Sequence, residues 1–257
     1  DDENQPRPVL INGQSGRVYG ARRASMQRAQ RTALIIVAVT TGLMTVIPSY
    51  WQTVAKDYAR QPPKPTLDAE VAYEDSLSLR KTEPQDRRIR PWDVRRAAYW
   101  NLFAGGFGHT YGHRSFIGWI RQGETYRYGA HIPWYESLDA PGARQMGHLR
   151  RLMESRPLLS RVPDQSLSAG DTLAGDEHLQ ATRDIDGSYA TVYSPSGRAV
   201  HVRMEKLAGP AVKARWFNPR TGEMTAIGEL ANTGERQFTP PSAGEDNDWV
   251  LVLDSKK

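Results

Sequence analysis

The chain has 257 residues, of which 39% are hydrophobic and 25% are charged, and its formal net charge is +5. This length suffices for one large globular domain or two ordinary ones. The absence of cysteine excludes disulfides and thiolate metal sites. The positive charge comes from arginines scattered among nearly as many acids, without the basic and aromatic clustering of a nucleic-acid interface, so we expect no nucleic-acid partner.

Residues 1–49 form a segment with two competing interpretations. Its first part is polar and rich in arginine, and the stretch 32–55 then contains no charged residue. Arginines before an apolar run are typical of a membrane anchor, but the dense apolar core is shorter than a bilayer span and runs into Pro48. We therefore expect no membrane association, and we interpret 1–49 as a disordered segment or as the product of a shifted reading frame.

An amphipathic helix is predicted over 49–60, and a proline-rich stretch then leads into the sequence KPTLDAEVAYED at 64–75. If 64–75 is extended, Asp68 and Glu70 share one face, and the small apolar residues Leu67, Ala69 and Val71 share the other. We expect the apolar face to pack on helices. The acidic face fits either a solvated strand edge or an active site, and the segment alone favours the former.

A second helix is predicted from residue 92, with Asp93 as its N-cap and Gly105 or Gly106 as its stop. The sequence FGHTYGHRSFIGW follows at 107–119. In an extended backbone its alternating polar side chains share a face that could bind sugar hydroxyls, although isolated histidines are more often structural; these residues are His109, Tyr111 and His113. Histidines without a carboxylate at fixed spacing are a poor zinc signal, so we expect no metal and no cofactor.

A further helix is predicted over 143–153, followed by a linker over 155–171. After residue 187 the chain consists of short alternating segments separated by turn clusters, which is typical of an antiparallel β-sandwich of about six strands. Three aromatic residues of these segments are either core or an exposed contact surface, namely Trp216, Phe217 and Trp249. The fold class is therefore α/β plus all-β, with the sandwich over 187–257.

Several long motifs together resemble the bacterial apiosidase-like glycoside hydrolases, in which a barrel precedes a sandwich domain named for collagen binding. The resemblance runs in order from about residue 50 to 254 through PPKPTLDAEVAYED, DVRRAAYWNLFAGGFGHTYGH, ATRDIDGSYATVYSPSGRAV, WFNPRTGEMTAIGE and DWVLVLD. It implies that 50–170 is the C-terminal portion of a (β/α)8 barrel. It also implies hydrolysis of O-glycosidic bonds in plant-type or related polysaccharides, a polysaccharide or oligosaccharide partner, and an extracellular or periplasmic location.

Carried over by position, Glu70 matches the presumed catalytic carboxylate of the family. The same resemblance assigns substrate binding to six further residues: Asp68, Tyr73, Glu74, His109, Tyr111 and His113. The chain departs from the family at Ala69, where glycine is usual, and at Val71, where proline is usual. Both departures bear on the backbone beside Glu70.

A complete barrel takes about 250 residues, so the resemblance implies an N-terminally truncated chain that lacks the second catalytic carboxylate and is inactive alone. Two alternatives remain open at this point. The sandwich could be a carbohydrate- or matrix-binding module beside a passive barrel remnant, or the protein could be anchored in a membrane through 32–55.

Overall fold

The computed structural model describes residues 10–11, 18–19, 50–62, 64–70, 72–78, 84, 86–126 and 129–256. The chain divides into two units, 1–44 and 45–257. In the first unit, β1 (Leu10–Ile11) and β2 (Val18–Tyr19) pair antiparallel. Most of the suggested membrane anchor, 32–49, lies outside the described residues; among those described, no helix is both long and apolar enough to cross a bilayer.

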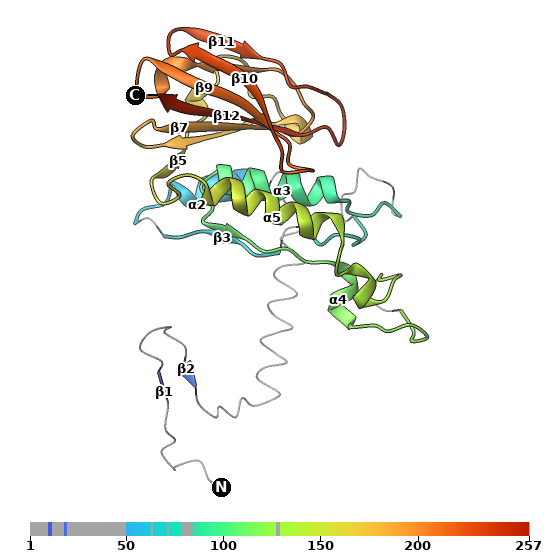
Figure 1. The fold of residues 1–257 in the computed structure, drawn as a ribbon. Helices are drawn as coiled ribbons and strands as arrows, with labels where there is room; N and C mark the ends of the chain where they lie inside the picture. Colours follow the sequence, from blue (N-terminus) through green and yellow to red (C-terminus); the bar gives the residue numbers. More distant parts are fainter. Residues whose placement is uncertain are drawn as a thin grey trace. The chain divides into compact units, whose positions relative to one another are not determined.

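The second unit begins with two parallel strands joined by a helix. Asp68 of β3 (Leu67–Asp68) lies opposite His109 of β4 (Gly108–His109), and α3 (Pro91–Phe103) makes the connection between them (Figure 1). Parallel strands need such a crossover, and strand–helix–strand units of this kind build α/β barrels. The flanking elements are α2 (Tyr50–Tyr58), α4 (Arg114–Gly118), the 3-10 helix η1 (Trp134–Ser137) and α5 (Pro141–Glu154).

Helix α3 begins three residues before the position expected with Asp93 as its N-cap. Arg90 is the N-cap, Pro91 occupies the first turn, and the Asp93 carboxylate accepts the backbone N–H of Arg90 at 2.9 Å. The helix ends just before Gly105, whose φ of +114° suits glycine. All residues from Trp92 to Phe103 are buried, so α3 is a central element rather than an amphipathic surface helix.

We predicted that Leu67, Ala69 and Val71 pack on helices. This prediction is wrong for Leu67 and Ala69, the two of these residues whose burial the structure describes. The Leu67 side chain is 41% exposed, and Ala69 is also exposed. Ala72 instead packs against α3, in contact with Val94 and Ala97. Strand pairing with β4 ends after Asp68, so strict alternation does not extend to Ala69 and Ala72.

The predicted antiparallel β structure is confirmed. Six strands form one antiparallel sheet in the order β10-β9-β12-β7-β6-β5, and β8 pairs with β11 in a second layer. The strands are β5 (Arg161–Pro163), β6 (Gln180–Asp184), β7 (Tyr189–Ser194), β8 (Val200–Arg203), β9 (Ala211–Phe217), β10 (Met224–Ala231), β11 (Glu235–Phe238) and β12 (Trp249–Lys256). The three 3-10 turns of this region are η2 (Gln165–Leu167), η3 (Gly175–Glu177) and η4 (Met204–Lys206).

The sheet starts earlier than residue 187. Strand β5 lies inside the stretch predicted to be a linker, and β6 precedes the expected boundary. Strand β5 has only three residues and ends in Pro163, so it carries no alternating pattern. Strand β6 is covered on both faces, which likewise hides the alternation of a half-exposed strand.

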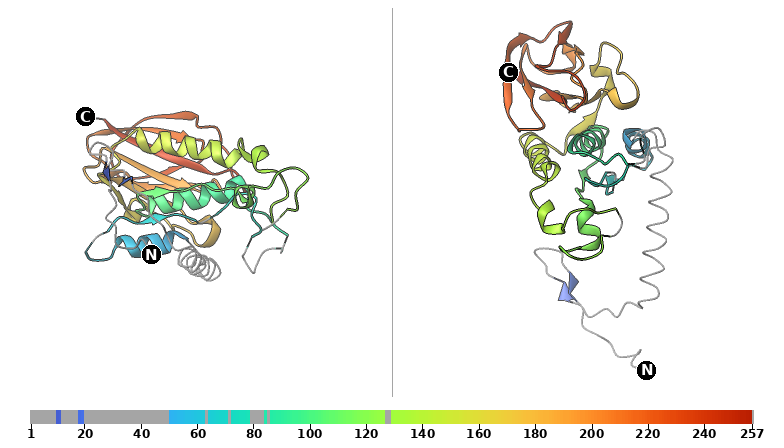
Figure 2. Two further views of the ribbon diagram at one scale, coloured as in Figure 1. Left: turned by 90° about the horizontal axis from the view of Figure 1, so that it is seen from below. Right: turned by 90° about the vertical axis from the view of Figure 1, so that its right-hand side faces the viewer.

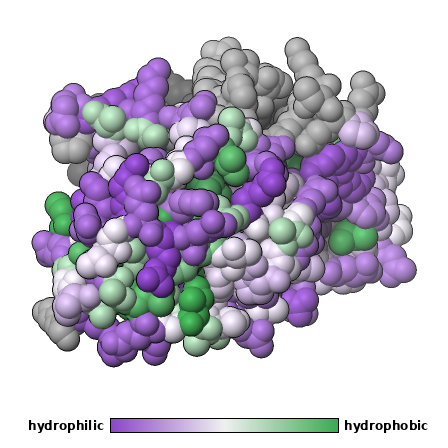
Figure 3. Space-filling view, turned by 90° about the horizontal axis from the view of Figure 1, so that it is seen from above, coloured by the Kyte–Doolittle hydropathy of each residue, from purple (hydrophilic) through white to green (hydrophobic). Residues whose placement is uncertain are grey.

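Both faces of the six-stranded sheet are buried. Along β12 the side chains alternate: Trp249, Leu251 and Leu253 face the β8–β11 layer, whereas Val250 and Val252 face α3 and α5. Figures 1 and 2 show the two helices lying across the sheet. The molecular face seen in Figure 3 is largely hydrophilic, with apolar residues in small separate groups. Each such buried aliphatic side chain contributes about 1.5–3 kcal/mol, so the helix–sheet contact is a major source of stability.

The aromatic residues left open by the sequence belong to this core. Trp216 and Phe217 are each 3% exposed and Trp249 is 6% exposed. Trp216 and Trp249 pack in the cluster between the two sheet layers, and Phe217 packs in the cluster between sheet and helices. These rings therefore do not form an exposed contact surface.

A buried ion pair fixes α3 to the sheet. The Arg95 side chain is 1% exposed, and its Nη2 donates to Asp248 at 2.8 Å, while the Asp248 side chain is fully buried. The Arg95 Nη1 donates to Gln145 of α5 at 2.7 Å, and the Tyr193 hydroxyl donates to Asp248 at 3.2 Å. One guanidinium thus connects both helices to the start of β12.

Removing either charge should be strongly destabilising. We expect Asp248→Asn to lower the free energy of unfolding by about 3–5 kcal/mol, because it leaves the buried Arg95 charge without its partner. The control is Arg150→Ala, which removes an exposed pair with Glu154 on α5 and should cost about 0.5 kcal/mol or less. Urea denaturation monitored by fluorescence measures both, and equal effects of the two variants would contradict the anchoring role.

Candidate active site at the carboxyl end of the parallel strands

The parallel pairing brings the segment around Glu70 beside the loop that begins at His109. Beyond the paired residues, the Thr110 hydroxyl donates to the carbonyl of Ala69, and the Glu74 N–H donates to the carbonyl of Gly112 at 2.9 Å. Segments 67–74 and 108–113 therefore continue side by side to their carboxyl ends. In α/β barrels these ends carry the catalytic groups.

Glu70 lies in a bend after β3 and is exposed. Its carboxylate forms a side-chain hydrogen bond with Tyr73, and burial of the phenol together with the charge of Glu70 raises the pKa of Tyr73 to about 12. The Tyr73 ring lies directly on Gly112, where an added Cβ would be 2.2 Å from the ring. Gly112, in the loop after β4, therefore allows the Tyr73 ring to lie where it approaches Glu70.

Glu74 is a second carboxylate with the opposite environment. It is 5% exposed and accepts hydrogen bonds from the Tyr111 hydroxyl at 2.7 Å and from the Gly142 N–H at 3.0 Å. Burial raises the pKa of Glu74, against the opposing effect of these two hydrogen bonds. Gly142 lies in the first turn of α5, where the helix dipole favours a carboxylate, so Glu74 and Tyr111 connect both strands to α5.

His109 is the polar side chain of the loop that lacks a partner. Both of its ring nitrogens are buried without a hydrogen bond to any described residue, and burial lowers its pKa to about 4. At neutral pH the ring is therefore uncharged and offers one donor and one acceptor. Buried polar groups normally have partners, which makes His109 a candidate for contact with a bound molecule.

The two remaining predicted residues lie close by. The His113 side chain is 4% exposed, and its Nδ1 accepts the N–H of Ser115 at 3.2 Å as the cap of α4. Asp68 lies in register with His109, and its side chain is outside the described part of the structure. Direct contact of Asp68, Glu74, Tyr111 or His113 with a substrate stays a prediction.

The arrangement supplies an exposed carboxylate and a neutral imidazole on adjacent strands. A carboxylate can act as a nucleophile, acid or base, and a neutral imidazole can bind hydroxyl groups. Across the described residues, no three His, Asp or Glu side chains converge as a metal site. The chemistry that these groups can perform is acid–base or nucleophilic substitution.

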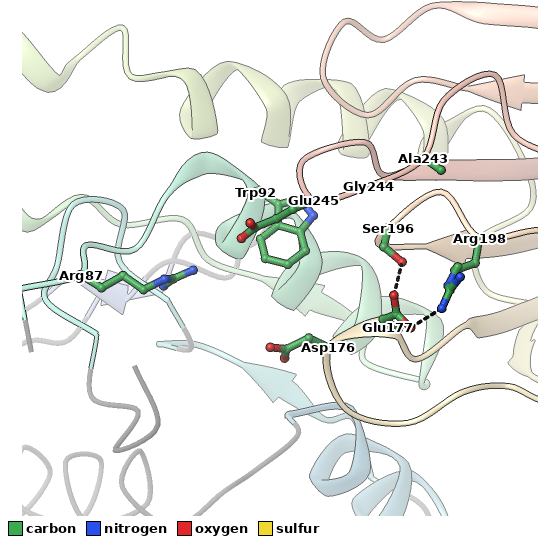
Figure 4. A pocket seen from close by; sticks show the side chains of 9 residues that line it. All are labelled: Arg87, Trp92, Asp176, Glu177, Ser196, Arg198, Ala243, Gly244 and Glu245. Atoms are coloured by element: carbon green, nitrogen blue, oxygen red, sulfur yellow. Dashed lines mark hydrogen bonds and ion pairs between the residues drawn. The ribbon is translucent and has the colours of Figure 1, made fainter. Parts of the chain in front are cut away.

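A cavity of about 480 Å³ lies away from this site, between the start of α3 and the loops of the sheet domain (Figure 4). Its carboxylates are paired with arginines at its edge: Glu177 with Arg198 at 3.1 Å, and Asp176 with Arg96 at 3.0 Å. The Trp92 ring in its wall is 6% exposed and donates to the carbonyl of Pro195 at 2.9 Å. These groups hold α3 against the sheet domain, so we do not place the chemistry there.

Sequence reasoning missed two partners of the site. Gly142 donates to Glu74 from 68 positions further along the chain, and the His131 ring lies 2.9 Å from the Asp75 carboxylate. The sequence signal for the first was weak, a glycine after Pro141 at the start of a helix. The second has no local signal, since it depends on how the loop after β4 folds back.

Two alanine substitutions on α5 test the Glu74 anchor. An added Cβ at Gly142 would be 2.3 Å from the Glu74 carboxylate, whereas at Gly147 the nearest atom is the flexible end of Arg151 at 3.6 Å. We expect Gly142→Ala to destabilise by about 1–3 kcal/mol and Gly147→Ala to stabilise by about 0.5–1 kcal/mol. Thermal denaturation distinguishes them, and stabilisation by both would show that Glu74 is not held tightly.

His109 should make stability depend on pH in a defined window. Its folded pKa lies below its unfolded value of about 6.5, so its contribution is fully present above pH 6.5 and is lost as the pH falls toward 4. We expect wild type to lose up to roughly 3 kcal/mol relative to His109→Gln across this window. Urea titrations of both proteins between pH 7 and 4 measure the difference, and parallel curves would contradict the burial of the ring.

Comparison with known families identifies two regions of the chain. The family model of the apiosidase-like catalytic domain matches residues 10–160, and a model named for the collagen-binding domain of a collagenase matches residues 162–254. The first match begins within the segment before residue 50, where no resemblance was expected. No functionally curated protein matches the chain.

Two solved structures are similar to residues of both regions. One, named a glycoside hydrolase, is 36% identical with a TM-score of 0.75, covering 81% of this chain and 46% of that chain. The other, a glycoside hydrolase family 5 protein from Bacteroides vulgatus, is 35% identical with a TM-score of 0.76, covering 81% of this chain and 45% of that chain. This chain thus spans about half the length of the structures that it matches. The predicted family is confirmed: the chain belongs to the apiosidase-like glycoside hydrolases, with the collagen-binding-type sheet domain following the catalytic region.

Proposed function

We propose that the protein takes part in hydrolysis of O-glycosidic bonds in plant-type or related polysaccharides, with Glu70 as one of the two catalytic carboxyl groups. The observation that carries this proposal is the parallel register of Asp68 opposite His109. That register puts an exposed carboxylate beside a loop with an unpaired neutral imidazole at the carboxyl end of two strands. Family membership supports the reaction class.

Within this proposal the exposed Glu70 carboxylate and the unpartnered His109 imidazole contact the substrate. Glu70 acts as nucleophile or acid/base, and His109 binds a substrate hydroxyl. Glu74 and Tyr111 hold the two strands in position through the hydrogen bonds described above, and Tyr73 orients Glu70. The assignment of Glu70 follows the requirement that a catalytic group must be reachable by the substrate.

The second carboxyl group comes from another strand. Glycosidases place two carboxyls on either side of the scissile bond. Among the described side chains near Glu70, Glu74 is buried, and Asp75 lies 2.9 Å from His131 and 3.5 Å from Arg88. We therefore propose that α2 to α5 are the C-terminal part of a (β/α)8 barrel whose other strands supply the second carboxyl, and that these 257 residues alone are inactive.

A polysaccharide substrate also indicates where the protein acts. Polymers of this kind lie outside the cytoplasm, so we propose an extracellular or periplasmic location. The alternative of a sheet domain that binds carbohydrate through exposed aromatics gains no support, since Trp216, Phe217 and Trp249 are buried.

The test is hydrolysis of pectic polysaccharide, measured as release of reducing sugar. In the longest polypeptide read in frame with this chain, we expect Glu70→Gln to lower kcat by about 10²–10⁴-fold, because the amide can neither attack nor transfer a proton. Glu235→Gln, an exposed glutamate on β11, is the matched control and should leave kcat unchanged. Unchanged turnover in Glu70→Gln would overturn the assignment.

A further inference from the structure

A cluster of aromatic rings follows β4 directly. We call Trp119, Trp134 and Tyr135 the aromatic shelf. The ring centroids of Trp119 and Trp134 are 5.3 Å apart, and those of Trp134 and Tyr135 are 5.8 Å apart. Phe116 supports Trp119 from α4, at 5.7 Å and an interplanar angle of 70°. The rings therefore have a fixed arrangement through edge-on contacts.

Trp119 is unusual both in exposure and in backbone. Its side chain is 61% exposed, so it contributes little to the core. Its φ is +49°, in the left-handed region, at the C-cap of α4 where glycine is the usual residue. A bulky residue in this conformation is strained, and such strain clusters at functional sites. Both features are unfavourable for folding, which calls for a role in binding.

Three contacts fix the loop that carries the shelf: two reach Glu74 and Asp75, directly after Tyr73, and one reaches Arg88. The Arg114 N–H donates to the carbonyl of Glu74 at 2.9 Å, and the His131 ring lies 2.9 Å from the Asp75 carboxylate. Arg88 Nη1 donates to the carbonyl of Gly129 at 2.8 Å. The segment that carries the shelf lies beyond the carboxyl end of β4, near the start of α5 (Figure 1).

The loop also closes on itself. The backbone N–H of Trp134 donates to the carbonyl of Ile120 at 3.0 Å. This hydrogen bond joins the two ends of the loop between Trp119 and Trp134. The shelf is therefore a fixed surface, continuous with the candidate active site rather than with the sheet domain.

We infer that the aromatic shelf is a sugar-binding subsite next to Glu70, with Trp119 stacking on the C–H face of a pyranose or furanose ring. The inference rests on the proposed function. A sugar ring presents polarised C–H bonds on one face, which match the negative face of an indole. An exposed indole that neighbouring rings support offers this contact at low entropic cost, because few side-chain torsions must be ordered. The bound glycan then extends from the shelf toward the Glu70 carboxylate.

The test uses the full 257-residue chain and oligosaccharides from partial hydrolysis of pectin, titrated by calorimetry. We expect Trp119→Ala to weaken binding about tenfold or more. Trp119→Gly should weaken binding equally while folding at least as stably as wild type, since glycine relieves the positive φ. The matched control is Phe107→Ala, which removes a 57% exposed ring at the opposite end of β4 and should leave the affinity unchanged.

Three results would overturn the inference: no binding by wild type, equal affinity in wild type and Trp119→Gly, or a change of oligomeric state in sedimentation without a change in glycan affinity. The last would identify the shelf as a contact between two copies of the chain. Binding is measured without hydrolysis, so the proposed function can fail separately. If Glu70→Gln leaves turnover unchanged while Trp119→Gly abolishes binding, the subsite stands and the catalytic assignment falls.

Discussion

Helices α3 and α5 cover one face of the antiparallel sheet, and the rest of the unit 45–257 depends on that contact. The cluster between them joins Tyr99 and Phe103 of α3 to Val250 and Val252 of β12. The Tyr99 ring stacks on Tyr193 of the sheet at 4.8 Å. A sheet whose central strands are apolar on both faces cannot leave one face in water. The sheet domain therefore acts as the second layer that the two short parallel strands and their helices need in order to bury their apolar surface.

The packing of α3 on the sheet also determines where the residues of the candidate site lie. The helix is the crossover between β3 and β4, so fixing its position through Arg95 and Asp248 also limits where the two strands can lie. Helix α5 is fixed in the same way, and its first turn supplies the N–H that binds Glu74. The polar contacts at the carboxyl ends of the strands are thus built on helices that the sheet domain holds rigidly, as precise placement of functional groups requires.

The sequence predicts some elements of this structure well and others poorly. Strands β7 to β12 follow from the alternation within short segments and from the turn residues between these segments. The burial of β3 was predicted wrongly, since alternation assumes a continuous strand and pairing stops after two residues. Glu70 and Glu74 show most clearly what the sequence cannot predict, because nothing in the local sequence indicates which of them is buried. The burial of Glu74 depends on its long-range partners Tyr111 and Gly142.

The contrast between these carboxylates also explains why they cannot exchange roles. Glu74 is removed from water, and its oxygen accepts from two protein donors, so a proton transfer there would break contacts that hold α5. Glu70 is exposed and hydrogen-bonded to a phenol whose pKa of about 12 keeps it a donor at neutral pH. In the proposed function Tyr73 orients Glu70 while the Glu70 carboxylate stays exposed, a combination that a buried glutamate four residues along cannot provide.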